Sequence, residues 1–209
     1  MNRFVLLGSF VLLAACGGGE TDVENTESGP TELGVSTAAA ERVLKGPLPE
    51  PCLLIDEARA QELLSAVEVF QRQGTDTPAV ERSCTYQAGT GDEHRVVGVF
   101  LNMMGGVFED SASLSDERVQ ELMMAFMDGA ELVSRDQSMG RWVFVFNDED
   151  TTIVRVITGV RGTAVMSDRL VSEGHITMSL KDKSRGVQER EAVLREEAKR
   201  VYGVLLERT

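Results

Sequence analysis

The amino-acid sequence predicts an α+β fold, a single domain in which about three helices pack on a mostly antiparallel sheet. Three stretches place apolar residues at the spacing of an amphipathic helix. Several other stretches are rich in β-branched and aromatic residues and are separated by turns of Gly, Asp and Asn. Hydrophobic residues make up 42% of the 209-residue chain, enough for one ordinary core. This mixture favours helices packed on a sheet face.

The first helix is expected over residues 57–71. Asp56 is a good N-cap, and four apolar residues follow at helical spacing: Ala60, Leu63, Leu64 and Val67. Two β-like runs come next, at residues 83–88 and 96–103. The residues between them, Gly89-Thr90-Gly91-Asp92, are the types that a hairpin turn prefers.

The order of a helix and then a hairpin recurs in the middle of the chain. The expected elements are a helix capped by Ser113 or Ser115, with apolar residues Val119, Leu122, Met123 and Phe126, and strands at residues 131–135, 141–146, 152–160 and 163–166. Gly129 ends the helix, and the acidic turn 147–150 joins the hairpin strands. Two helix–hairpin repeats and an ordinary α+β layout both explain this order.

A β-like run at residues 175–180 precedes a long closing helix over residues 187–207. The apolar stripe of this helix consists of Leu194, Ala198, Val201 and Leu205. Two i,i+4 ion pairs are expected on its surface, Glu191–Arg195 and Glu196–Arg200.

Residues 1–15 are expected to form a secretory signal peptide, because Arg3 precedes an apolar run and then small residues. The run is too short to span a bilayer, which takes about 20 residues. The order Leu13-Ala14-Ala15-Cys16, followed by three glycines, resembles the signal of bacterial lipoproteins. The resemblance implies cleavage after Ala15, a diacylglyceryl group on Cys16, and acylation of the new amine by a chain such as palmitate.

Several acyl chains would make this membrane anchor stable. Gly17 is not the aspartate that resembles an inner-membrane retention signal. The resemblance therefore implies the outer membrane of a Gram-negative cell envelope, with the domain facing the periplasm. The alternative is an ordinary signal peptide that leaves Cys16 as a free thiol.

Residues 16–50 are expected to form a lipidated, acidic, flexible tether, and residues 51–209 the globular domain. Residues 17–50 hold seven acidic residues against Arg42 and Lys45, with little apolar surface to offset the entropy of ordering. The proline-rich segment 46–51 disfavours regular structure. A short helix is expected at residues 37–44.

The formal net charge of the chain is −13, and it becomes −14 once the signal peptide and its Arg3 are removed. Such a surface repels nucleic acid and anionic lipid headgroups. The charge therefore argues against nucleic acid as a partner.

Cys52 and Cys84 remain as an even pair once Cys16 is lipidated. In an oxidising compartment a disulfide between them is the expected outcome. The competing interpretation is a thiol nucleophile or a metal site, for which only His94 and His175 offer an imidazole.

Pro51-Cys52-Leu53-Leu54, followed by Cys84-Thr85-Tyr86, resembles a pair of motifs in small bacterial envelope lipoproteins, several of them of unknown function. The resemblance implies a PsbP-like fold, with a sheet between helices. It covers about 35 residues, and it transfers no functional residue. Residues 138–142 depart from the family's Gly-x-Gly-Asp-like turn, since they hold one glycine and no acid.

No catalytic residue, cofactor or metal site is predicted. His94 and His175 lack the spacing of zinc ligands, and the acidic turn 147–150 lacks the order of a calcium loop. The methionines that could bind copper are expected to fill the core: Met103, Met104, Met123, Met124 and Met127. The chain has no Gly-x-Ser-x-Gly elbow and no glycine-rich phosphate loop.

Residues 142–146 alternate aromatic side chains with valines, so this strand is apolar on both faces and is expected in the core. Three functions remain open. The first is a non-enzymatic envelope lipoprotein that acts through contact with another envelope protein. The second is a lipid or small-molecule binding module, whose apolar pocket Trp142 or Phe100 would border. The third is a hydrolase with a composite site that the sequence does not reveal.

Overall fold

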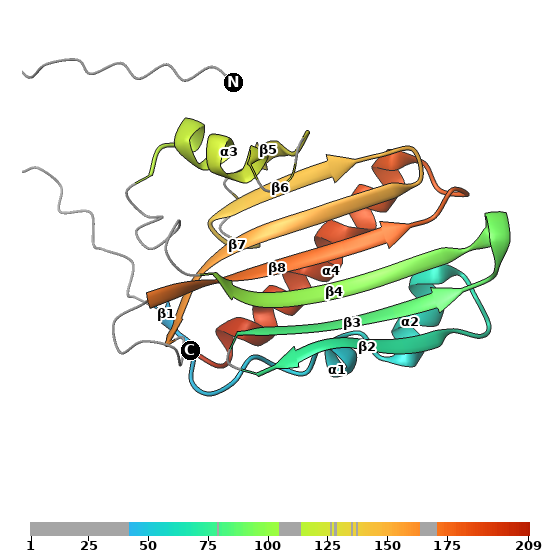
Figure 1. The fold of residues 1–209 in the computed structure, drawn as a ribbon, viewed down its shortest axis with the longest axis horizontal. Helices are drawn as coiled ribbons and strands as arrows, with labels where there is room; N and C mark the ends of the chain where they lie inside the picture. Colours follow the sequence, from blue (N-terminus) through green and yellow to red (C-terminus); the bar gives the residue numbers. More distant parts are fainter. Residues whose placement is uncertain are drawn as a thin grey trace, which may run out of the picture. The chain divides into compact units, whose positions relative to one another are not determined.

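One mixed sheet forms the framework of the domain (Figure 1). The computed structural model describes residues 42–78, 80–104, 114–125, 127, 129–134, 136, 138–163 and 171–209. In these residues the strands are β1 (Arg42–Val43), β2 (Phe70–Thr77), β3 (Glu81–Ala88), β4 (Arg95–Met104), β5 (Glu131–Ser134), β6 (Trp142–Asn147), β7 (Thr151–Thr163) and β8 (Val171–Lys181). The helices are α1 (Pro51–Leu54), α2 (Glu57–Leu64), α3 (Asp116–Met124) and α4 (Val187–Leu206), with a 3-10 turn η1 (Gly91–Glu93).

The strands lie in the order β2-β3-β4-β8-β7-β6-β5, and every neighbouring pair is antiparallel. β1 adds a short parallel pair beside β7. The fold is therefore α+β with a mostly antiparallel sheet, as the sequence predicts.

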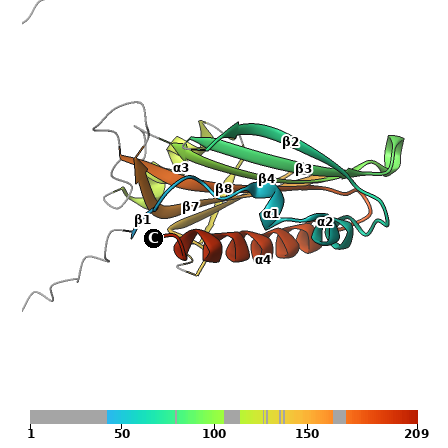
Figure 2. The ribbon, with the colours of Figure 1, turned by 90° about the horizontal axis from the view of Figure 1, so that it is seen from below.

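Different helices cover the two faces of the sheet. α1, α2 and α4 lie on one face (Figure 2), where Val143 and Val145 of β6 belong to the larger core cluster with α4. The alternating residues Trp142 and Phe144 point to the opposite face and pack with α3. The strand that is apolar on both faces is thus covered on both.

The two halves of the sheet share one order of elements, α2-β2-β3-β4 and α3-β5-β6-β7. β8 lies between them, and both β4 and β7 pair with it in the antiparallel direction. Equivalent strands therefore run in the same direction, while α2 and α3 pack on opposite faces. The predicted order of a helix and then a hairpin is present twice, with one more strand in each half.

The helix predicted to reach residue 71 ends at Leu64 instead. Ser65 adopts the left-handed conformation, with φ of 47°, and this ends α2. Val67, expected on the buried stripe, is 90% exposed. β2, which the sequence did not predict, begins soon afterwards at Phe70.

The elements of the second half lie close to their predicted positions. Ser115 caps α3, and its hydroxyl accepts a hydrogen bond from the backbone N–H of Arg118 at 3.3 Å. The other cap candidate, Ser113, lies outside the described residues, as does Phe126. β5 and β6 match the predicted strands. β7 continues through Gly162, so the separate strands predicted at 152–160 and from 163 onward are one strand as far as Thr163. Thr163 is the last described residue of β7, so the rest of the strand predicted at 163–166 lies outside the described part.

α4 matches the predicted closing helix to within one residue, and the residues of its apolar stripe are buried: Leu194, Ala198, Val201 and Leu205. The predicted Glu191–Arg195 pair is present, with Nε and Oε1 2.8 Å apart. The predicted pairing of Glu196 with Arg200 is wrong. Arg200 binds the buried Glu197 instead, because a carboxylate that leaves water requires cationic partners.

Residues 42–50, which the sequence places in the tether, take part in the fold. β1 pairs with the end of β7 beyond Ile157, where the pairing of β7 with β6 has ended. The backbone N–H of Lys45 donates to the Arg208 carbonyl at 2.7 Å, and Leu48 is buried in the core. The boundary therefore lies earlier than predicted, because β7 offers this segment backbone partners and the core accepts its leucine.

The helix expected at 37–44 is wrong for residues 42 and 43, which form β1. Residues 1–41, with the predicted signal peptide and Cys16, lie outside the described residues. In the described part, every helix is too short or too polar to cross a membrane.

The sulfur atoms of Cys52 and Cys84 lie at disulfide distance, 2.06 Å, in agreement with the predicted pairing. The bond joins α1 to β3. α1 has four residues, too few for a helix to be stable alone, so it depends on such attachments. The Tyr86 hydroxyl adds a hydrogen bond of 3.4 Å to the Cys52 carbonyl.

Candidate functional site

A buried carboxylate fixes α2 against α4. Asp56 caps α2 by accepting a hydrogen bond from the Arg59 backbone N–H at 2.8 Å. The Arg59 side chain reaches across to Glu197 of α4, whose other oxygen accepts from Arg200 Nε at 3.0 Å. Arg200 also donates to the Leu54 carbonyl at the end of α1. Two guanidiniums thus offset the cost of burying Glu197 and hold α1 and α2 on α4.

Arg190 fixes two loops at the start of α4. Its side chain is buried, and its Nη atoms donate to four backbone carbonyls at 2.7–3.3 Å. These carbonyls belong to Asp148 and Glu149 in the β6–β7 turn and to Asp182 and Arg185 in the β8–α4 loop. Nε donates to the Thr152 hydroxyl at 3.1 Å. The loop that carries Arg185 is therefore held in place from inside the domain.

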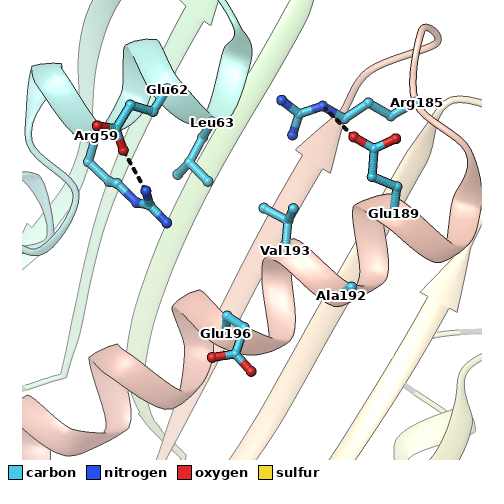
Figure 3. Close-up of a pocket in the computed structure, with 8 residues that line it drawn as sticks. All are labelled: Arg59, Glu62, Leu63, Arg185, Glu189, Ala192, Val193 and Glu196. Atoms are coloured by element: carbon cyan, nitrogen blue, oxygen red, sulfur yellow. Dashed lines mark hydrogen bonds and ion pairs between the residues drawn. The ribbon is translucent and has the colours of Figure 1, made fainter.

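Between α2 and the first half of α4 lies an open groove of about 430 Å³ (Figure 3). Its lining residues are Arg59, Glu62 and Leu63 of α2, Arg185 of the β8–α4 loop, and Glu189, Ala192, Val193 and Glu196 of α4. Leu63, Ala192 and Val193 form an apolar floor, and the charged residues form the rim.

Both guanidiniums of the rim are engaged by carboxylates. Arg59 Nη1 lies 2.5 Å from Glu62 Oε2, and Arg59 also binds Glu197. The hydrogen bonds to Glu197 and then to Glu62 raise the pKa of Arg59 above its ordinary value. Arg185 Nε lies 3.5 Å from Glu189 Oε1 on the other side of the groove. The two cations of the rim are thus largely neutralised by the protein itself.

Glu196 is the exception on the rim. Across the described residues, no hydrogen bond or ion pair involves its carboxylate, which is exposed to solvent. The rim carries three carboxylates against two guanidiniums. The groove can therefore offer a negative group beside an apolar floor.

The aromatic residues proposed to border a pocket lie elsewhere. Trp142 is 1% exposed beneath α3, and its indole N–H donates to Asp116 Oδ1 at 3.1 Å. Phe144 is also buried there. Phe100 is half-buried on β4. Its chain neighbours Val99 and Leu101 face α4, so Phe100 lies on the opposite face of the sheet. Trp142 and Phe144 therefore serve the core, as expected.

The two histidines lie near opposite ends of β4, so they are far apart. His175 is 1% exposed in β8, opposite Asn102 near the end of β4. His94 is half-buried in the turn before β4, and its backbone N–H donates to the Gly91 carbonyl at 3.2 Å. Burial, and then the charge of Arg155, lowers the pKa of His175 to about 3.

This pKa predicts an acid-sensitive fold. The unfolded chain takes up a proton on His175 below about pH 6.5, whereas the folded domain does not until about pH 3. Stability should therefore fall as the pH drops through this window, by about 2 kcal/mol from His175 alone between pH 7 and pH 5.

Urea unfolding at the two pH values checks this expectation in wild type and His175→Gln. The variant should lose about 2 kcal/mol less than wild type, whatever its starting stability. Thr177→Val, two residues along the same strand, should keep the wild-type loss. An equal loss in His175→Gln would contradict the prediction.

The remaining sequence candidates have structural roles. Met103 and Met123 are buried, and Met127 packs against the α3 cluster. Met124, which was expected in the core, is instead exposed on α3, because it lies on the side of that helix that faces away from Val119 and Met123. In the acidic turn, Asp150 lies 3.4 Å from Lys181 Nζ. Among the described residues, no group of three or more His, Cys, Asp or Glu side chains is placed to hold a metal ion.

The sequence did not reveal the groove, because its two walls lie more than 120 residues apart in the chain. One signal was present: α4 repeats Glu every few residues on its polar side, and an apolar pair, Ala192-Val193, interrupts them. No family model, curated protein or solved structure matches this chain.

Proposed function

We propose that this chain is a lipid-anchored protein of the bacterial cell envelope that acts without catalysis, through contact with another envelope protein. The anchor rests on the lipoprotein-like order Leu13-Ala14-Ala15-Cys16. The contact is assigned to the groove between α2 and α4.

The shape and chemistry of this groove are the observation that supports its assignment as the contact site. It is open to solvent and has an apolar floor. Its charged rim comes from α2, the β8–α4 loop and α4, and is held by the buried Glu197 and Arg190 of α4. Interfaces between proteins combine an apolar centre with a polar rim in this way. Since Glu197 and Arg190 hold its walls, the groove is formed before a partner arrives, which lowers the entropy cost of binding.

Removing the lipidation site should release the protein from membranes. Full-length Cys16→Ala is expected to move from the membrane fraction to the soluble fraction, because no acyl chain holds it. Fractionation and mass measurement of the mature chain check this. The control is Cys52→Ala with Cys84→Ala, which keeps Cys16 and should stay with the membrane. Unchanged fractionation of Cys16→Ala would contradict the anchor.

The contact site is tested by placing a photo-crosslinking amino acid at Ala192 in the full-length chain in its own host. A discrete adduct with one envelope protein is expected. The control position is Arg72 of β2, which is exposed and pairs with Thr85 on the sheet face opposite α4. If Ala192 gives no protein adduct, the proposed contact site is wrong.

A further inference from the structure

We infer that the groove between α2 and α4 accepts a cationic, amphipathic segment of the partner protein. A lysine or arginine of that segment pairs with Glu196, and an apolar side chain beside it lies on Leu63, Ala192 and Val193. This inference rests on the proposed function, since it names the chemistry of the partner at the same site.

The sign of the charge follows from which rim groups are already engaged. Arg59 is bound by Glu62 and Glu197, and Arg185 lies between Glu189 and Asp182, at 3.5 and 3.4 Å. An anion would have to displace one of these carboxylates. A cation meets Glu196 with no internal partner to displace, so the groove favours positive charge.

The net charge of the chain from residue 42 onward has the same sign. Residues 42–209 hold 28 acidic and 20 basic side chains, a net charge of −8. A field of this sign steers basic segments toward the domain and repels anionic lipid surfaces. Long-range attraction and the local rim therefore select the same class of partner.

The floor explains why the segment is amphipathic. Leu63 is almost fully buried, while Ala192 and Val193 are accessible from the groove. Lysine and arginine cover such a surface with their aliphatic stems and keep their charged ends at a polar rim. A simple metal cation would leave the floor uncovered.

The test extends the crosslinking experiment at Ala192 by sequencing the captured peptide. The captured segment is expected to carry a lysine or arginine within one helical turn of the crosslinked residue. Adding Glu196→Lys should lower the crosslink yield about tenfold. The matched control is Glu207→Lys, at the C-terminal end of the same helix and outside the groove, which should leave the yield unchanged.

A charge swap completes the test. Changing the captured lysine or arginine to glutamate should restore the adduct with Glu196→Lys. Circular dichroism and urea unfolding of each variant establish that the domain is folded. Capture of a neutral or acidic segment, or a yield insensitive to Glu196→Lys, would overturn this inference and leave the proposed contact standing. Absence of any protein adduct at Ala192 would overturn both.

Discussion

Replacing Arg190 with methionine is expected to destabilise the domain by about 4 kcal/mol, although the side chain pairs with no carboxylate in the described residues. Arg190 is buried and donates five hydrogen bonds, four of them to backbone carbonyls in two loops. Each buried acceptor left without a donor costs about 1–3 kcal/mol, reduced here because the loops lie near solvent. Methionine keeps most of the apolar volume, so the loss reports the hydrogen bonds.

Urea unfolding of the domain measures this effect, with Arg195→Met as the control. Arg195 lies on the same helix, and among the described residues Glu191 is its one hydrogen-bonded ion-pair partner, so its loss should cost less than about 1 kcal/mol. Arg190→Lys should recover less than half of the stability, because an ammonium cannot reach both loops as a guanidinium does. A loss below 1 kcal/mol in Arg190→Met would show that other contacts hold the two loops.

Removing both cysteines of the Cys52–Cys84 pair should destabilise the domain by about 3–4 kcal/mol. The pair closes a loop with a sequence separation of 32, and chain-entropy estimates give this magnitude for such a loop. Alanine is the suitable replacement, since it adds no polar atom at the buried Cys84. The loss should be accompanied by faster hydrogen exchange in α1 and α2, because the bond holds α1 on β3.

Unfolding of the double alanine variant, and of wild type with and without a thiol reductant, measures this prediction. Reductant should lower the stability of wild type toward that of the variant and leave the variant unchanged. If reductant has no effect on the unfolding midpoint of wild type, the two thiols are not joined in the native protein.

The sequence predicted those elements whose local signals agree with their packing. The apolar stripe of α4 and the runs of β-branched and aromatic residues in β4, β6 and β7 are of this kind. So are the alternating Cys84 and Tyr86 of β3 and the cap at Asp56. β2 was missed because an edge strand buries little: its sequence, Phe-Gln-Arg-Gln-Gly-Thr-Asp-Thr, is polar and contains a glycine. Its register also shifts between Gln73 and Asp76.

The helix α2 was overextended for a related reason. Val67 continues the apolar spacing of Leu63 and Leu64, so a prediction from periodicity extends the helix beyond Leu64. The left-handed Ser65 that ends α2 has no strong sequence signal, since serine is not the residue that favours this conformation.

The candidate site depended on distant pairings that periodicity does not report. A helical arginine such as Arg190 is ordinarily taken as a surface residue, and its burial follows from where the β6–β7 turn and the β8–α4 loop meet. Likewise, the sequence predicted Glu196 as the partner of Arg200, whereas Arg200 pairs with Glu197 in the structure, because Arg59 of α2 shares that carboxylate. The Glu196 carboxylate therefore lies at the groove without an ion-pair partner among the described residues.

If the chain is anchored at Cys16 as proposed, the pairing of β1 with β7 also has a mechanical consequence. Tension on the chain ahead of Arg42 acts first on the two-residue β1, then on the Lys45 hydrogen bond and on Leu48. Release of residues 42–51 would lengthen the connection by roughly 30 Å. The bond from Cys52 to Cys84 then stops the extension before α2 and the groove come under load. Residues 42–51 would therefore extend under tension until the disulfide takes up the load.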